Sequence, residues 1–322
     1  MSIKMELTRK ALRVKKEFNK KMFAGELTSI HQALSINETR DAPYIIKKIA
    51  FSNLKIQKQT IANVNVFSIN PKKTKYFANT TMLNDYCLLY IHGGGFVSGF
   101  ALQSAYFIKS FIKQTGIKAL AVDYSLSPEV VFPTALNQIY DVYLQLIKTY
   151  KPKNIILMGE SAGANLALSL MLKLRNSKKP LPKMGILASG YFDLTNSGKS
   201  YYLNAESDPL LLPPQTALMA TAYVAGNCIL PLAKEELVNP YISPIFANLK
   251  GLPPLFISAC EDELLFSDSE TIYNNCLRDN VKCKFNITKN CFHAHLILGD
   301  FFAESKAVTE DCCNYVKQIL KI

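Results

Sequence analysis

The chain has 322 residues, of which 49% are hydrophobic, and its formal net charge is +12. This length suits one catalytic domain with a small appendage. Lysine supplies most of the positive charge. It is spread along the chain without an arginine cluster or a nucleic-acid-binding signature, so we expect no nucleic-acid partner.

Residues 1–43 are expected to form N-terminal cap helices. Apolar residues recur there at steps of three and four, which predicts an amphipathic helix with a basic opposite face; they are Ile3, Leu7, Val14, Phe18 and Met22. We expect this helix to pack as a lid over the protein, with a peripheral membrane contact as the alternative. The segment lacks the apolar region of a secretory signal. No uncharged apolar run approaches the roughly 20 residues needed to span a bilayer, so no transmembrane segment is expected.

The eight cysteines form no C-x-x-C pair and show no zinc-finger spacing. A disulfide framework is typical of much shorter secreted chains. We therefore expect reduced thiols, a cytoplasmic protein and no metal site.

Residues 44–322 are expected to form the catalytic domain. Two β-rich runs, Tyr44–Phe51 and Asn63–Ile69, could pair as a hairpin. After residue 85, short apolar strands alternate with helical stretches, which is typical of βαβ units and a parallel sheet. These strands are Tyr86–Ile91, Lys118–Val122, Ile155–Met158, Met184–Ala188, Leu255–Ser258 and Lys282–Ile287, which brings the predicted total to eight. Residues 195–244 interrupt the rhythm and are expected to contribute to the cap.

A G-x-S-x-G sequence, residues 159–163, follows one of these strands and opens a helical stretch. This context is typical of a nucleophile elbow, in which flanking glycines permit a tight turn and the central serine, Ser161, projects into the site. The helix that begins after the serine favours negative charge at its N-terminus.

A second glycine-rich motif, His92-Gly93-Gly94-Gly95-Phe96, follows an earlier strand. Successive glycines allow backbone amides to converge on one point, as in the oxyanion hole of esterases with an H-G-G-G motif. We predict that the amides of Gly94, Gly95 and Ala162 bind an oxyanion. His92 is interpreted as a brace of this loop and not as a general base.

These two motifs resemble those of the hormone-sensitive-lipase-like family of α/β-hydrolases, the carboxylesterases with an H-G-G-G motif. The resemblance extends from about residue 40 to the C-terminus. Three further segments are similar to family motifs, namely Val122–Glu129 to DYRLAPE, Ser189–Thr195 to SPWxDLT and Asn239–Pro244 to DPxxSP. Ser125 and Gly190 stand where the family usually has arginine and proline, so local salt bridges and the wall near Tyr191 are expected to differ.

The resemblance implies an α/β-hydrolase fold, with a mostly parallel eight-stranded sheet flanked by helices and a helical cap. The order of the catalytic triad in this fold is serine, acid, histidine. Of the four histidines, His31 lies in the expected cap and His92 precedes the serine. The resemblance places the catalytic histidine at His293, and we interpret His295 as a packing or rim residue.

Acidic residues follow the strand Leu255–Ala259 in a row, as Glu261, Asp262 and Glu263. An E-V-L-L-x-D-S pattern found in part of the family aligns without a gap if Glu263 is the acid. The D-P-L pattern of other members selects Asp262 instead. Either carboxylate could orient the imidazole. We prefer Glu263 and keep Asp262 as the alternative.

The resulting hypothesis is a serine carboxylesterase that hydrolyses short-to-medium acyl esters through an acyl-enzyme, without a cofactor. Phe96, Tyr191 and Leu211 are candidates for the substrate pocket. The alternatives are an amidase, such as an arylformamidase, with the same triad, or a non-catalytic small-molecule-binding member of the fold. The oligomeric state stays open, with a homodimer through the final strand and helix as one option.

Overall fold

The computed structural model describes residues 1–23, 51–228 and 232–322. In these ranges a single eight-stranded sheet has the order β1-β2-β4-β3-β5-β6-β7-β8. The strands are β1 (Leu54–Ile61), β2 (Val64–Pro71), β3 (Cys87–Ile91), β4 (Lys118–Asp123), β5 (Ile155–Glu160), β6 (Met184–Ala188), β7 (Leu255–Cys260) and β8 (Cys283–Thr288). β2 pairs antiparallel with both β1 and β4, and the remaining pairs are parallel. The predicted mostly parallel sheet is therefore confirmed.

The first strand differs from the prediction. The expected strand Tyr44–Phe51 lies outside the described residues except for Phe51, which is in a turn. β1, at residues 54–61, takes the place of that strand in the predicted hairpin with β2. Only Leu54 of β1 is buried, because the strand lies at the edge of the sheet. An edge strand with one solvated face needs few apolar residues, so its hydropathy pattern is weak.

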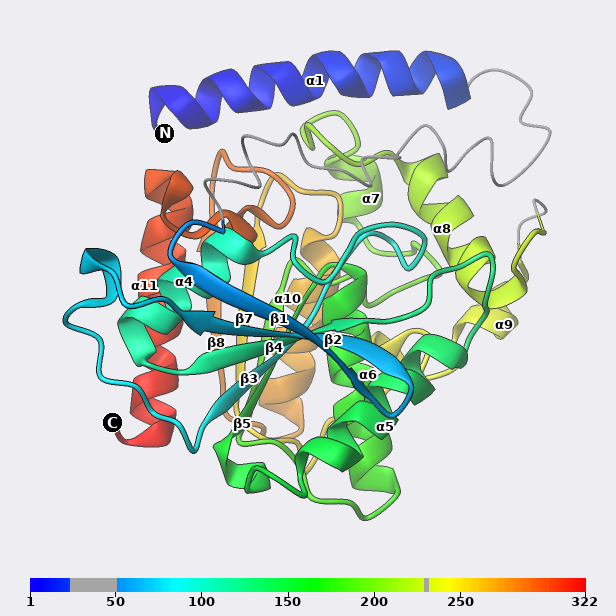
Figure 1. Ribbon diagram of the computed structural model, residues 1–322. Coiled ribbons are helices and arrows are strands. Elements are labelled where there is room, and N and C mark those ends of the chain that lie inside the picture. Colours follow the sequence, from blue (N-terminus) through cyan, green and yellow to red (C-terminus); the bar gives the residue numbers. More distant parts are fainter. Residues whose placement is uncertain (24–50, 229–231) are drawn as a thin grey trace.

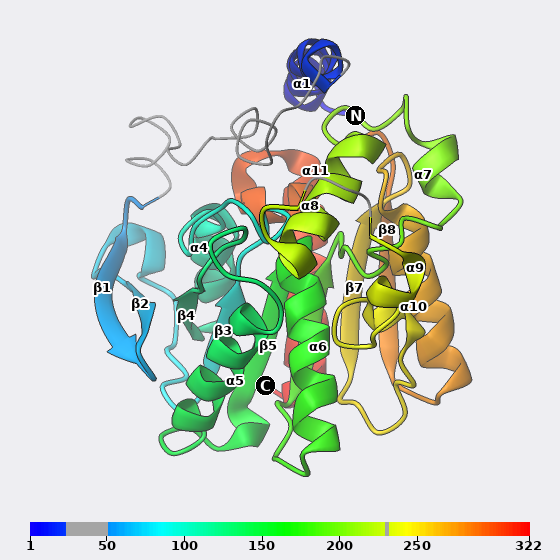
Figure 2. The same cartoon turned by 90° about the vertical axis from the view of Figure 1, so that its right-hand side faces the viewer.

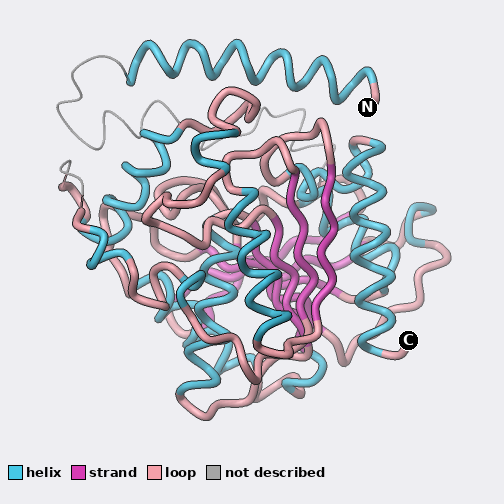
Figure 3. Tube along the Cα trace, turned by 180° about the vertical axis from the view of Figure 1, so that it is seen from behind, coloured by secondary structure: helices cyan, strands magenta, loops and turns pink. Residues whose placement is uncertain are grey.

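Two helical layers enclose the sheet (Figures 1 and 3). On one face, α4 (Ala105–Thr115) and α11 (Ala303–Leu320) share an apolar cluster with the strands. On the other face the cluster includes α5 (Thr134–Leu146), α6 (Ala162–Asn176) and α10 (Phe266–Arg278). Every residue of β3, β5, β6 and β7 is buried, as expected of parallel strands covered on both faces.

Residues 195–244, the expected cap segment, contain three short helices within their described part. These are α7 (Ser200–Leu203), α8 (Pro213–Ala225) and α9 (Lys234–Leu237). Figure 2 shows α8 above the N-terminal end of α6, on the side of the molecule where α1 (Ile3–Phe23) lies.

The predicted packing face of α1 is wrong. Ile3, Leu7 and Val14 are 77%, 61% and 74% exposed, whereas Met5 and Lys16 are 0% and 3% exposed. The side chains of Phe18 and Met22 lie outside the described residues. The inner face of the helix carries Met5, which packs in an apolar cluster with Phe292 and Phe302. It is also held by polar contacts, such as those from Lys16 Nζ to the carbonyl oxygens of residues 205 and 208, at 2.5 and 2.6 Å. Neither α1 nor any other described helix is both long and apolar enough to cross a membrane.

Candidate active site

Ser161 occupies a tight turn between β5 and α6. Its backbone has φ 55° and ψ −123°, an unfavourable conformation for a residue with a side chain. A Cβ atom at Gly159 would collide with the Gly163 backbone, and one at Gly163 would collide with the carbonyl oxygen of Ile91. The Ser161 amide donates a 2.9 Å hydrogen bond to Ala188 O of β6. The flanking glycines are therefore required by close packing, and the turn is held against the neighbouring strand.

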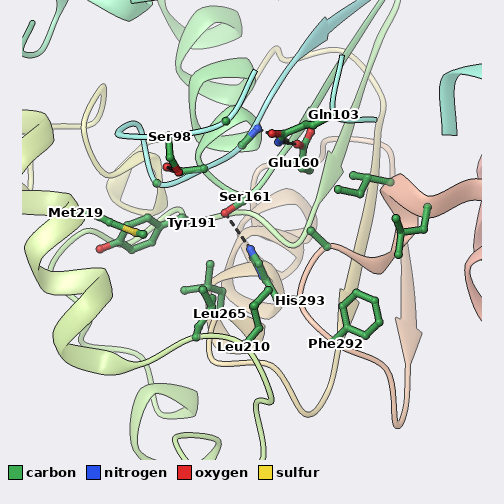
Figure 4. A pocket seen from close by; sticks show the side chains of 18 of the residues that line it. Ser98, Gln103, Glu160, Ser161, Tyr191, Leu210, Met219, Leu265, Phe292 and His293 are labelled. Carbon is green, nitrogen blue, oxygen red and sulfur yellow. Dashed lines mark hydrogen bonds between the residues drawn. The ribbon is translucent and has the colours of Figure 1, made fainter. Parts of the chain in front are cut away.

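His293 lies in the loop after β8 and points at the serine (Figure 4). Its Nε2 atom is 2.9 Å from Ser161 Oγ, and its Nδ1 atom is 3.4 Å from Glu263 Oε2. The Ser189 hydroxyl donates to that same Glu263 oxygen at 2.8 Å and accepts from the Ala294 amide at 3.0 Å. Ser189 thus joins the carboxylate to the histidine loop. The structure brings together Ser161, His293 and Glu263 in a row.

The electrostatic surroundings of His293 favour its charged form. Burial by itself lowers the pKa of the imidazole. The Glu263 carboxylate opposes this through hydrogen bonding and charge, and the net effect raises the pKa of His293 above its ordinary value. The positive charge of a protonated His293 is therefore stabilised by the neighbouring carboxylate.

Asp262, the alternative acid, faces away from His293. Its Oδ2 atom accepts from Arg9 Nη1 of α1 at 3.2 Å and from the Asn290 amide at 2.6 Å. Arg9 also donates to Cys291 O, two residues before His293. Asp262 therefore holds α1 and the histidine loop together, and Glu263 alone of the two lies next to the imidazole.

The glycine loop after β3 lines the same cavity as Ser161. Gly94 and Gly95 have φ values of 113° and 62°, and a Cβ at Gly94 would collide with Ser98 O. The amide of Gly93 is already bonded to Glu160 Oε1, at 2.8 Å, which leaves the next two amides of the loop as candidate donors. Ala162 is buried and is the first residue of α6, directly after the serine.

Glu160, the variable residue inside G-x-S-x-G, was not identified from the sequence. It is 1% exposed, and its Oε1 atom accepts from Gly93 N, Tyr90 OH at 2.8 Å and Gln103 Nε2 at 2.5 Å. Burial raises the pKa of Glu160 to about 7, although these three donors oppose the shift. The carboxylate therefore fastens the glycine loop to the serine turn.

We expect Glu160→Ala to lower kcat by about ten- to a hundredfold with little change in KM, because the glycine amides lose their support. Glu160→Gln keeps an acceptor oxygen for Gly93 and should retain most of the activity. Steady-state kinetics of both variants, with melting curves to verify folding, check this. Equal kcat values for the alanine variant and the parent enzyme would contradict the positioning role.

The two other described histidines, His92 and His295, make their contacts away from the serine. His92 is buried, its Nδ1 atom is 2.8 Å from Gly93 O, and its ring stacks on Tyr124 at 4.2 Å. His295 lies between Thr288 and Ser305, with ring nitrogens 2.9 and 3.2 Å from their hydroxyls. His31 lies outside the described residues. Within the part of the chain that the structure describes, no group of three or more His, Cys, Asp or Glu side chains could hold a metal ion.

A largely apolar cavity of about 620 Å³ opens at Ser161 (Figure 4). Tyr191 and Leu211 line it, as expected. Phe96 is not among the lining residues, because it is buried and stacks on Tyr223 with ring centroids 3.9 Å apart. Other lining residues come from α1 (Leu12 and Lys15), the cap segment (Leu210 and Met219), the turn after β7 (Leu265) and the stretch after β8 (Phe292 and Leu298).

Asp208 is a second residue that sequence reasoning missed. Its side chain is fully buried. The Oδ1 atom accepts hydrogen bonds from the amides of Leu210 and Leu211 at 2.7 and 3.0 Å, and the Oδ2 atom accepts one from the Leu264 amide at 2.7 Å. One side chain therefore links the pocket wall to the residue after Glu263. The only local signal was an aspartate before a proline, which indicates a turn.

Comparison with known proteins gives a consistent result. The family described as having the alpha/beta hydrolase fold matches residues 88–297. An esterase of Acinetobacter venetianus is 30% identical over 80% of this chain and 82% of its own length. An acetyl-hydrolase of Streptomyces hygroscopicus is 26% identical over 84% and 89% of the two chains. Among solved structures, a hormone-sensitive lipase from a metagenome library has a TM-score of 0.78 and 25% identity, with 97% and 98% of the two chains covered.

Proposed function

We propose that this chain hydrolyses short-to-medium acyl esters through an acyl-enzyme on Ser161. The chain belongs to the α/β-hydrolase fold family and is a carboxylesterase similar to hormone-sensitive lipases. The observation that carries the proposal is the 2.9 Å contact between Ser161 Oγ and His293 Nε2. A base at this distance can accept the hydroxyl proton as the serine attacks.

In the proposed reaction, His293 takes the Ser161 proton while Ser161 Oγ forms a bond to the ester carbonyl carbon. The amides of Gly94, Gly95 and Ala162 bind the resulting oxyanion. Collapse of this intermediate breaks the bond to the alcohol, which leaves with the proton from His293. Water then attacks the acyl-enzyme by the same route and releases the carboxylic acid. Glu263 holds the imidazole in the required tautomer and stabilises its charged form.

The proposed substrate size is supported by the cavity. Its volume of about 620 Å³ and its leucine, methionine and phenylalanine lining suit an apolar acyl group. A panel of nitrophenyl esters of increasing acyl length, each paired with the matching anilide, tests the proposal. We expect the highest kcat/KM for short-to-medium esters and slow cleavage of the anilides. Faster cleavage of the anilides would favour an amidase, and failure of a fluorophosphonate to label the protein would favour a binding role.

A cytoplasmic location is part of the proposal. It is supported by six buried free thiols, because free cysteines persist in reducing compartments; they are Cys87, Cys260, Cys276, Cys291, Cys312 and Cys313. Cell fractionation of the tagged protein tests the location.

A homodimer through the last strand and helix is also proposed. β8 is an edge of the sheet, with one neighbour, so its outer backbone groups could pair with a second copy. Light scattering coupled to size-exclusion chromatography distinguishes the dimer from a monomer.

A further inference from the structure

The outer face of α1 carries an exposed apolar stripe. Ile3, Leu7 and Val14, called here the outer stripe, are all more than 60% exposed. Their spacing of four and seven residues places them on one line along the helix. Figures 1 and 2 show α1 as the outermost element at this end of the molecule, so its far side faces away from the body.

The opposite face of α1 is fixed to the body by polar contacts. Ser2 Oγ donates to Glu304 at 2.9 Å, Lys4 Nζ donates to Phe301 O at 2.8 Å, and Lys20 Nζ donates to Glu206 at 2.8 Å. Arg9 and Lys16, described above, lie between these anchors. Rolling the helix to bury the outer stripe would break all of these contacts. The orientation therefore keeps the stripe on the surface, where it is available to a partner.

The charge of α1 indicates what kind of partner fits. Its sequence has eight basic and two acidic residues, a net charge of +6, which is half of the +12 of the whole chain. This agrees with the basic N-terminal helix expected from the sequence. Lys10 and Arg13 are exposed beside the outer stripe. Arg9 and Lys16 are buried against the body, and Lys10 also pairs with Glu6 at 2.9 Å. The six other basic residues of the helix still outnumber Glu6 and Glu17. An apolar line beside predominantly cationic side chains complements a surface that is both apolar and anionic.

We infer that the outer stripe docks on a phospholipid bilayer that contains anionic lipid, with α1 lying in the plane of the interface. This inference rests on the proposed esterase function for its purpose. The same helix contributes Leu12 and Lys15 to the lining of the catalytic cavity. Docking through α1 would bring the cavity next to the membrane surface, where apolar esters concentrate.

The test is cosedimentation of the full-length protein with vesicles, either of phosphatidylcholine alone or with about one quarter phosphatidylglycerol. We expect binding to the anionic vesicles, with a loss of at least about tenfold in the triple variant Ile3→Ser, Leu7→Ser and Val14→Ser. Binding should also weaken as salt rises from about 50 to about 500 mM, because salt screens the basic side chains. A matched control replaces three exposed apolar residues on other elements, as Phe246→Ser, Leu277→Ser and Ile322→Ser, and should bind like the parent.

Three further measurements keep the outcomes separate. The triple variant should hydrolyse a water-soluble short-chain ester at the parental rate, since the outer stripe does not line the cavity. The double variant Lys10→Gln and Arg13→Gln should bind the anionic vesicles more weakly than the parent does, without a change in binding to phosphatidylcholine vesicles. This variant tests the proposal even if the triple variant folds poorly. Ser161→Ala should bind vesicles like the parent, so a failure of the proposed chemistry does not affect this readout.

Lack of vesicle binding by the parent protein, or equal binding by the triple variant and the parent, would overturn the inference. So would self-association in solution that the triple variant abolishes without any vesicle binding. In that case the occupant of the outer stripe is a second copy of the chain.

Discussion

Replacing Ser161 by alanine should lower kcat for a short-chain nitrophenyl ester by at least about ten-thousandfold, while the melting temperature stays close to that of the parent. The reason is geometric, since among the described residues only the Ser161 hydroxyl lies within hydrogen-bonding distance of His293 Nε2, at 2.9 Å. Without that oxygen no acyl-enzyme forms, and only binding and oxyanion stabilisation remain.

The matched control for this variant is Ser169→Ala in α6, the helix that follows Ser161. Ser169 is buried and donates to Tyr241 O at 3.1 Å, but it does not line the cavity. We expect its kcat to stay within about twofold of the parental value. Retention of esterase activity and of fluorophosphonate labelling by Ser161→Ala would refute the assigned nucleophile.

The second large effect is expected at Glu263. Glu263→Gln should lower kcat by about a hundred- to ten-thousandfold, because the imidazole loses the carboxylate that orients it and stabilises its charge. Asp262→Asn is the matched control, as it changes the adjacent acid in the same way. Its partners are Arg9 and Asn290, so we expect a lower melting temperature and a kcat within a few fold of the parent. The reverse ranking of the two variants would show that Asp262 is the triad acid.

The pH profile gives an independent readout of the same pair. Only neutral His293 can act as a base, so activity rises with pH as the imidazole loses its proton. The Glu263 carboxylate raises the pKa of His293, which moves this acid limb to higher pH. In Glu263→Gln the stabilising charge is gone, and the midpoint of the limb should move to lower pH. An unchanged midpoint in kcat/KM would mean that another group controls it.

Local patterns were sufficient wherever a short stretch of chain determines its own environment. The fully buried strands β3, β5, β6 and β7 are continuous apolar runs, so hydropathy located them. The turn at Ser161 needs glycine on both sides for steric reasons that hold wherever the motif follows a strand. The fold class and the tight turn that presents Ser161 could therefore be predicted from the sequence.

Tertiary structure decided the features that depend on distant parts of the chain. Asp262 and Glu263 are neighbours of the same chemistry, and only the path of the turn after β7 directs one to Arg9 and the other to His293. Glu160 and Asp208 can be recognised only from the donors that the fold brings beside them. Gly93 and Gln103 lie 67 and 57 residues before Glu160 in the chain, and Leu264 lies 56 residues after Asp208. The face of α1 that turns toward the body was also decided by distant parts of the chain. Its apolar spacing predicted a helix, but contacts with the body decided which face turns inward. Met5 and Leu12 pack against the body, and carbonyls and carboxylates of the body bind basic residues of the helix, so Ile3, Leu7 and Val14 remain outside. Sequence spacing does not reveal these partners, because they come from distant parts of the chain.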